Sequence, residues 1–140
     1  MCGEIDEQVQ VGQDLREQFA VMSSMLGLEP VTHSGEGPTG LADAKGRAAY
    51  MEQIFRDGLA LALHDVSAAA EEETVDALAS QAIALARLAG FIAGPLPPEG
   101  DLFRWLIDAD TAGHAEPAQM VAQYRRDRDQ QHAHSHDDHH

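Results

Sequence analysis

Cysteine, lysine and aromatic residues are scarce in this sequence of 140 residues. Cys2 is the only cysteine, so the chain cannot form an internal disulfide. Aromatic residues make up 5% of the chain, whereas hydrophobic residues reach 44% and alanine is abundant. Because alanine has the highest helix propensity, this composition favours a globular domain whose helices pack through small side chains.

Basic residues are few as a class. The 9 Lys and Arg residues are outnumbered by 24 Asp and Glu residues, which gives a formal net charge of -15. A surface this negative repels phosphate backbones, so we expect no nucleic-acid partner. A cationic partner or a metal ion would be attracted instead.

Familiar catalytic motifs are absent from the sequence. It contains no GxxxxGK[ST] phosphate-binding loop, no GxSxG, no HExxH, no CxxC and no ExxH pair. We therefore expect a protein that is not an enzyme. The alternative is a site that these motifs do not describe, built from His33, His64 or His114 beside carboxylates.

The N-terminus is acidic and has no apolar leader segment, so no secretory signal is expected and a cytoplasmic location follows. Residues 78–96 are about long enough to span a membrane. However, this segment contains Ser80, Gln81 and Arg87. We interpret it as a buried core helix and expect no membrane partner.

Apolar residues recur every three or four positions, and no segment alternates as a β-strand would. This spacing predicts helices over 4–27, 41–66, 75–92 and 98–112, with a glycine- and proline-rich loop at 28–40. Gly113 is expected to end the fourth helix, and Pro117 to begin a fifth. The fold class is thus all-α, a four- to five-helix bundle with a single domain over residues 1–128.

The third predicted helix, residues 75–92, is apolar on nearly every side. A helix of this kind must be covered all round. In a chain this short, it is either the central helix or a subunit interface. We expect a homodimer that depends on Leu85 and Leu88, with a further protein partner as a second possibility.

Residues 129–140 are rich in histidine and aspartate and are expected to form a flexible tail. Imidazole is a good ligand for nickel, zinc, cobalt and copper. Similar tails occur on proteins that handle nickel, cobalt and zinc. If the tail is extended, alternate histidines share one side; if it is helical, histidines four positions apart do. The predicted metal ligands are His132, His134, His136, His139, His140 and Asp137.

The sequence therefore predicts a small helical interaction protein with a metal-binding C-terminal tail. The alternative is the dimerisation or effector-binding domain of a helical regulator, in which the tail has no role. Removing the tail distinguishes these two hypotheses, because only the first predicts that the protein loses a function with the tail.

Overall fold

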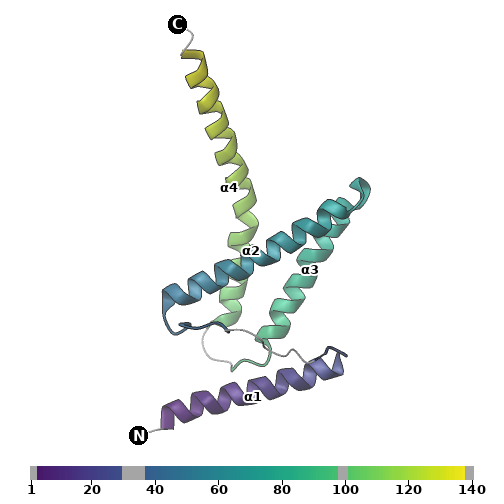
Figure 1. The fold of residues 1–140 in the computed structure, drawn as a ribbon, viewed down its shortest axis with the longest axis vertical. Coiled ribbons are helices and arrows are strands. Elements are labelled where there is room, and N and C mark those ends of the chain that lie inside the picture. The colour runs from purple at the N-terminus through teal and green to yellow at the C-terminus, as the bar shows by residue number, and fades with distance from the viewer. Residues whose placement is uncertain (1–2, 30–36, 98–100, 138–140) are drawn as a thin grey trace. The chain divides into compact units, whose positions relative to one another are not determined.

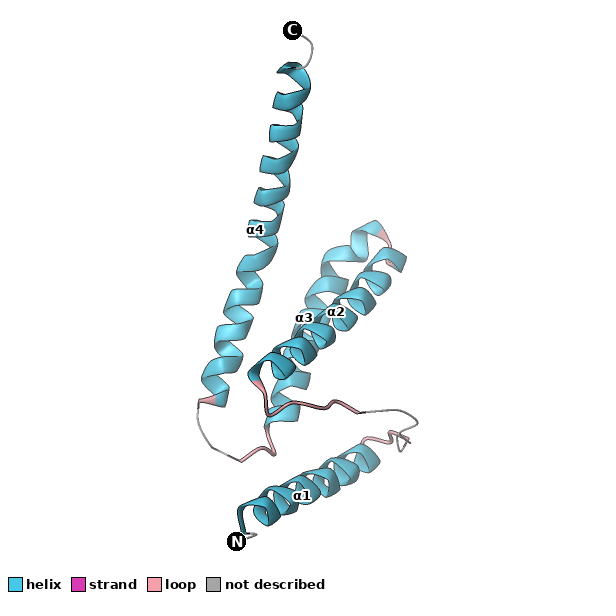
Figure 2. Cartoon of the chain, turned by 60° about the vertical axis from the view of Figure 1, so that its left-hand side comes forward, coloured by secondary structure: helices cyan, strands magenta, loops and turns pink. Residues whose placement is uncertain are grey.

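The computed structural model describes residues 3–29, 37–97 and 101–137. Within these ranges the chain is all-α, with helices joined by turns and loops and no strand (Figures 1 and 2). The α-helices are α1 (Gly3–Met25), α2 (Ala44–Ala68), α3 (Thr74–Ala93) and α4 (Leu102–Asp137). A short 3₁₀ helix, η1 (Glu71–Glu73), precedes α3. The prediction of an all-α chain is confirmed.

The chain divides into two compact units, Met1–Leu96 and Pro97–His140. The first unit holds α1, α2 and α3, and the second holds α4. In neither unit is any described residue buried. The predicted bundle and its core are therefore not seen within the described ranges and stay a prediction.

Helix α1 ends at Met25, two residues before Gly27, which the sequence predicts to stop it. The Leu28 N–H donates to the Ser23 carbonyl at 2.9 Å, and the Gly27 N–H donates to the Ser24 carbonyl at 3.0 Å. This pair of bonds is the Schellman arrangement, which satisfies carbonyls left open at a helix end. It requires a left-handed residue, and Gly27 has a φ of 72°. Glycine adopts that conformation at little cost.

Helix α2 begins at a tight turn in which two glycines touch. Gly40 has a φ of 70°, and a Cβ placed on Gly46 would collide with the Gly40 carbonyl oxygen. The Arg47 guanidinium donates to the carbonyls of Leu41 and Ala42, each at 3.0 Å. Glycine is thus required at position 46 because a backbone carbonyl occupies the space that a side chain would need.

Helices α2 and α3 form a hairpin, and they come closest near the turn that joins them (Figures 1 and 2). The Gln81 side-chain amide crosses between them and donates to the Ala62 carbonyl at 3.3 Å. In the turn, the Thr74 hydroxyl donates to the Ala70 carbonyl at 3.2 Å. Ala62, Val66 and Gln81, which lie towards this end, are half-buried.

Helix α4 corrects the prediction of two separate helices. It continues without a break from Leu102 to Asp137, with Gly113 and Pro117 inside it. Proline lacks an N–H and its ring crowds the carbonyl four residues earlier, which here belongs to Gly113. The flexible backbone of glycine at that position can absorb the crowding, so the two residues weaken the helix without ending it.

Candidate functional site

Helix α3 carries an apolar stripe that its own hairpin does not cover. The residues lie three and four positions apart in alternation, the spacing of a coiled-coil seam. Its large members are exposed, from 75% for Val75 to 47% for Leu78. The stripe, called the α3 stripe below, consists of Val75, Leu78, Ala82, Leu85, Ala89 and Ile92.

The charged residues of α3 avoid this stripe. Asp76 and Arg87 are the only charged residues in the helix, and at 100° per residue both fall on the opposite side. The acidic run Glu71–Glu73 lies just before the helix, in η1. Negative charge is favourable at a helix N-terminus. The stripe is thus uncharged along its length and acidic at one end.

The α3 stripe refines the sequence-based prediction of a helix that is apolar nearly all round. The stripe borders the side that packs towards α2, since Leu78 and Leu85 lie three and four residues from Gln81, and its mean direction is turned roughly 70° from Gln81. The three-and-four spacing of Val75, Leu78 and Leu85 is present in the sequence and would have identified the stripe. Alanines between the large residues hide it, since they make every side of the helix look apolar.

A groove of about 880 Å³ lies between α1 and α3, and its lining reaches the α3 stripe at Ile92. Most of its lining is apolar, including Phe19, Leu88 and Phe91, and Arg87 is its one charged residue. A groove of this size can accept a ligand or a helix. It holds no histidine and no carboxylate, so it offers no acid–base pair.

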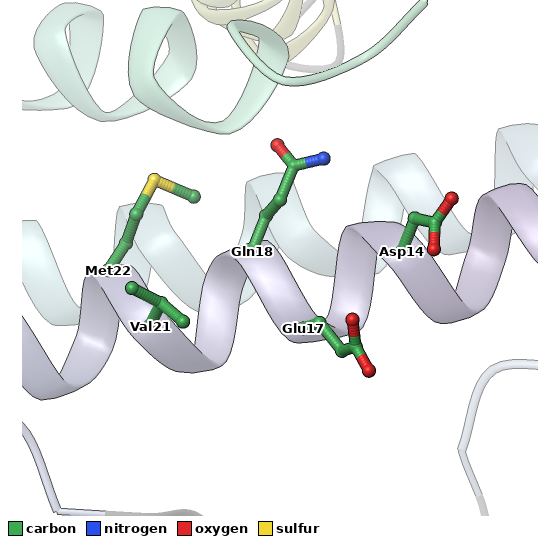
Figure 3. A pocket seen from close by; sticks show the side chains of 5 residues that line it. All are labelled: Asp14, Glu17, Gln18, Val21 and Met22. Atoms are coloured by element: carbon green, nitrogen blue, oxygen red, sulfur yellow. The ribbon is translucent and has the colours of Figure 1, made fainter.

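A second recess lies on α1 alone, lined by Asp14, Glu17, Gln18, Val21 and Met22. Figure 3 shows Gln18 and Met22 projecting to the same side of the helix. One helix surface cannot enclose a ligand. Its two carboxylates also fall short of a metal site, since no three His, Cys, Asp or Glu side chains gather to hold an ion anywhere in the described chain.

The predicted metal ligands lie at the end of α4 or beyond it. His132 and His134 are exposed on α4. His136 and Asp137 belong to its last turn, whereas His139 and His140 lie outside the described residues. Because α4 is helical to Asp137, positions 132 and 136 are one turn apart on the same side of the helix. The sequence allows an extended or a helical backbone here, and the structure has the helical one.

The other histidines do not form a site in the described structure. His64 is exposed and lies 3.5 Å from the Asp65 carboxylate, and His114 is exposed on α4. Neither lines the groove or the recess. His33 lies outside the described residues. The enzymatic alternative gains no support from these positions.

One stretch of the described chain, Glu71–Ala93, is long and apolar enough to cross a bilayer, judged by length and composition alone. None of it is buried within the structure. The segment includes the whole α3 stripe. A surface that covered the stripe would account both for the apolar composition of this helix and for its exposure in the single chain.

Comparison with known proteins gives no relative. No protein-family model, curated protein or solved structure matches this chain.

Proposed function

We propose that this chain is a small helical interaction protein that self-associates through α3 and binds divalent transition metals at the C-terminal end of α4. The observation that carries the proposal is the exposed α3 stripe. Burying one large aliphatic side chain contributes roughly 1.5–3 kcal/mol. Val75, Leu78, Leu85 and Ile92 are all at least 47% exposed, so covering them provides a strong drive to associate.

The test of self-association is the mass of the chain in solution, measured by light scattering. We expect a dimer for the unaltered chain and for a chain shortened to residues 1–128. Leu85→Asp places a carboxylate in the centre of the stripe, where burial of an unpaired charge is costly. It should convert the dimer to a monomer that keeps its helical circular dichroism.

The matched control is Ile83→Asp. Ile83 lies on the same helix and is 72% exposed, compared with 53% for Leu85, but it lies on a different side. It should leave the dimer intact. A dimer that survives Leu85→Asp, or an unaltered chain that is monomeric, would contradict the proposal. Uptake of α3 by lipid vesicles in place of dimerisation would favour a membrane-associated helix instead.

Metal binding is supported by the helical backbone around His132 and His136. Two histidines one turn apart on a helix can chelate a single ion, and neutral imidazole suits nickel, zinc, cobalt and copper. The tail as a whole adds carboxylate at Asp137 and imidazole at His139 and His140, in keeping with the predicted ligand set. The net charge of -15 raises the local concentration of cations around it.

The arrangement of the ligands is testable by titration calorimetry with nickel or zinc. In the helical form, His132→Ala or His136→Ala should each weaken binding by at least about tenfold, since loss of a direct ligand costs no less than the roughly 10–100-fold loss of an outer-shell partner. His134→Ala is the control, because position 134 lies on another side of the helix, and it should change little. Equal losses for all three would indicate an extended tail, and no loss for any would exclude these ligands.

A further inference from the structure

Self-association through α3, which the proposed function supplies, can occur in two orientations. The order of side-chain sizes along the α3 stripe distinguishes them. Its central residues alternate between large and small: Leu78, Ala82, Leu85 and Ala89. In a parallel pair each position of the seam meets its own counterpart. Thick Leu–Leu layers would then alternate with thin Ala–Ala layers.

A parallel pair would therefore pack poorly. Helices held apart by the leucines leave voids at the alanines, and a void removes the dispersion contacts of the atoms around it. Moving the helices together to close the voids would force the leucines against one another. Neither spacing satisfies both kinds of layer.

An antiparallel pair removes this conflict. When the two-fold axis crosses the stripe midway between Ala82 and Leu85, Leu78 meets Ala89 of the second copy, and Ala82 meets Leu85. Under a two-fold axis each contact occurs twice, because residue i meets j and j meets i. Every central layer then contains one leucine and one alanine, so all four layers have the same thickness.

The charge distribution favours the same orientation. Glu71–Glu73 lie directly before α3 and are exposed. A parallel pair would bring the acidic runs of both copies together, and like charges side by side oppose association. In an antiparallel pair the two runs lie at opposite ends of a helix of 20 residues, about 30 Å apart.

We propose that two copies of this chain pair antiparallel through α3, with the two-fold axis crossing the α3 stripe midway between Ala82 and Leu85. The surface is the α3 stripe, and the partner is a second copy whose alanines receive the leucines of the first. Val75 of one copy then meets Ile92 of the other at each end of the contact.

Disulfide trapping tests this pairing in the full chain with Cys2→Ser as background. Leu78→Cys, Ala89→Cys and the double variant are oxidised with diamide at low protein concentration and run on a non-reducing gel. The double variant should form a covalent dimer, because position 78 of one copy faces position 89 of the other. Each single variant should stay unlinked, because identical positions are eleven residues apart along the axis, or about 16 Å, beyond disulfide reach.

The possible results distinguish a wrong antiparallel arrangement from an absence of self-association. A covalent dimer from Leu78→Cys alone would show a parallel pair and overturn the inference. So would a dimer by light scattering that no variant traps. A chain that is monomeric by light scattering would overturn the proposed function itself. Val75→Cys with Ile92→Cys gives the same readout at the ends of the stripe if loss of Leu78 prevents folding.

Discussion

Gly46 and Gly58 lie in the same helix, α2, but their surroundings differ. A Cβ on Gly46 would collide with the Gly40 carbonyl oxygen, whereas a Cβ on Gly58 would meet nothing within 4 Å. Glycine is therefore needed at the first position for space. At the second it only weakens the helix, since it loses more backbone entropy on folding than alanine does.

We predict opposite effects of alanine at these two sites. Gly58→Ala should raise the free energy of unfolding by about 0.5–1 kcal/mol. Gly46→Ala should lower it by about 1–3 kcal/mol, the usual range for an overpacked site, because the turn at Gly40 must move. Urea denaturation followed by circular dichroism measures both. Equal stabilisation by the two changes would mean that the Gly40–Gly46 contact is absent in solution.

At the scale of the element, α4 shows that glycine and proline in a sequence do not always mark the end of a helix. Gly113 and Pro117 are ordinary signals for the end of one helix and the start of another. The structure instead runs one helix through both. Proline in a helix interior costs about 3 kcal/mol relative to alanine, so Pro117 weakens the interior of α4.

We predict that Pro117→Ala strengthens α4 locally. The new N–H can donate to the Gly113 carbonyl, and the clash with the ring is removed. Amide hydrogen exchange at residues 114–119 should slow by at least tenfold, and Glu116→Ala, one position away, should change it little. Unchanged exchange in Pro117→Ala would instead support two helices, with Pro117 at the first position of the second.

The end of α4 is an element whose conformation decides its chemistry. The sequence names the candidate ligands but leaves open whether alternate histidines or histidines one turn apart share a side. The helix settles the spacing of positions 132 and 136 through its backbone alone. Sequence reasoning could not do so, because residues 125–131 contain no apolar periodicity that would favour a helix over a coil.

At the scale of the whole molecule, helices were easier to predict from the sequence than their packing. Apolar periodicity located α1, α2 and α3 to within a few residues, and Gly27 marked the end of α1. The covering of the apolar sides depends on contacts between distant segments, for which one sequence has no local signal. The α2–α3 hairpin is the only such contact that a side-chain hydrogen bond marks among the described residues, through Gln81.

Net charge gives a prediction for the whole molecule. Each copy carries a formal charge of -15, so two copies repel one another while their apolar stripes attract. Salt screens the repulsion, since the Debye length falls from about 30 Å at 0.01 M to about 8 Å at 0.15 M. Raising sodium chloride across this range should tighten dimerisation by on the order of tenfold.

Analytical ultracentrifugation at several protein concentrations measures this dependence. Leu85→Asp provides the control and should remain monomeric at every salt concentration. Weaker dimerisation at higher salt would indicate that ion pairs, and not the α3 stripe, hold the copies together.

Trp105 gives the protein an optical signal for one helix only. It is the single tryptophan of the chain, lies near the start of α4 and is 67% exposed. Indole emission moves to shorter wavelengths when water is displaced from around the ring. Emission that stays constant while the protein dimerises would therefore assign the contact to a surface without an indole, and a blue shift would reveal that α4 becomes covered as well.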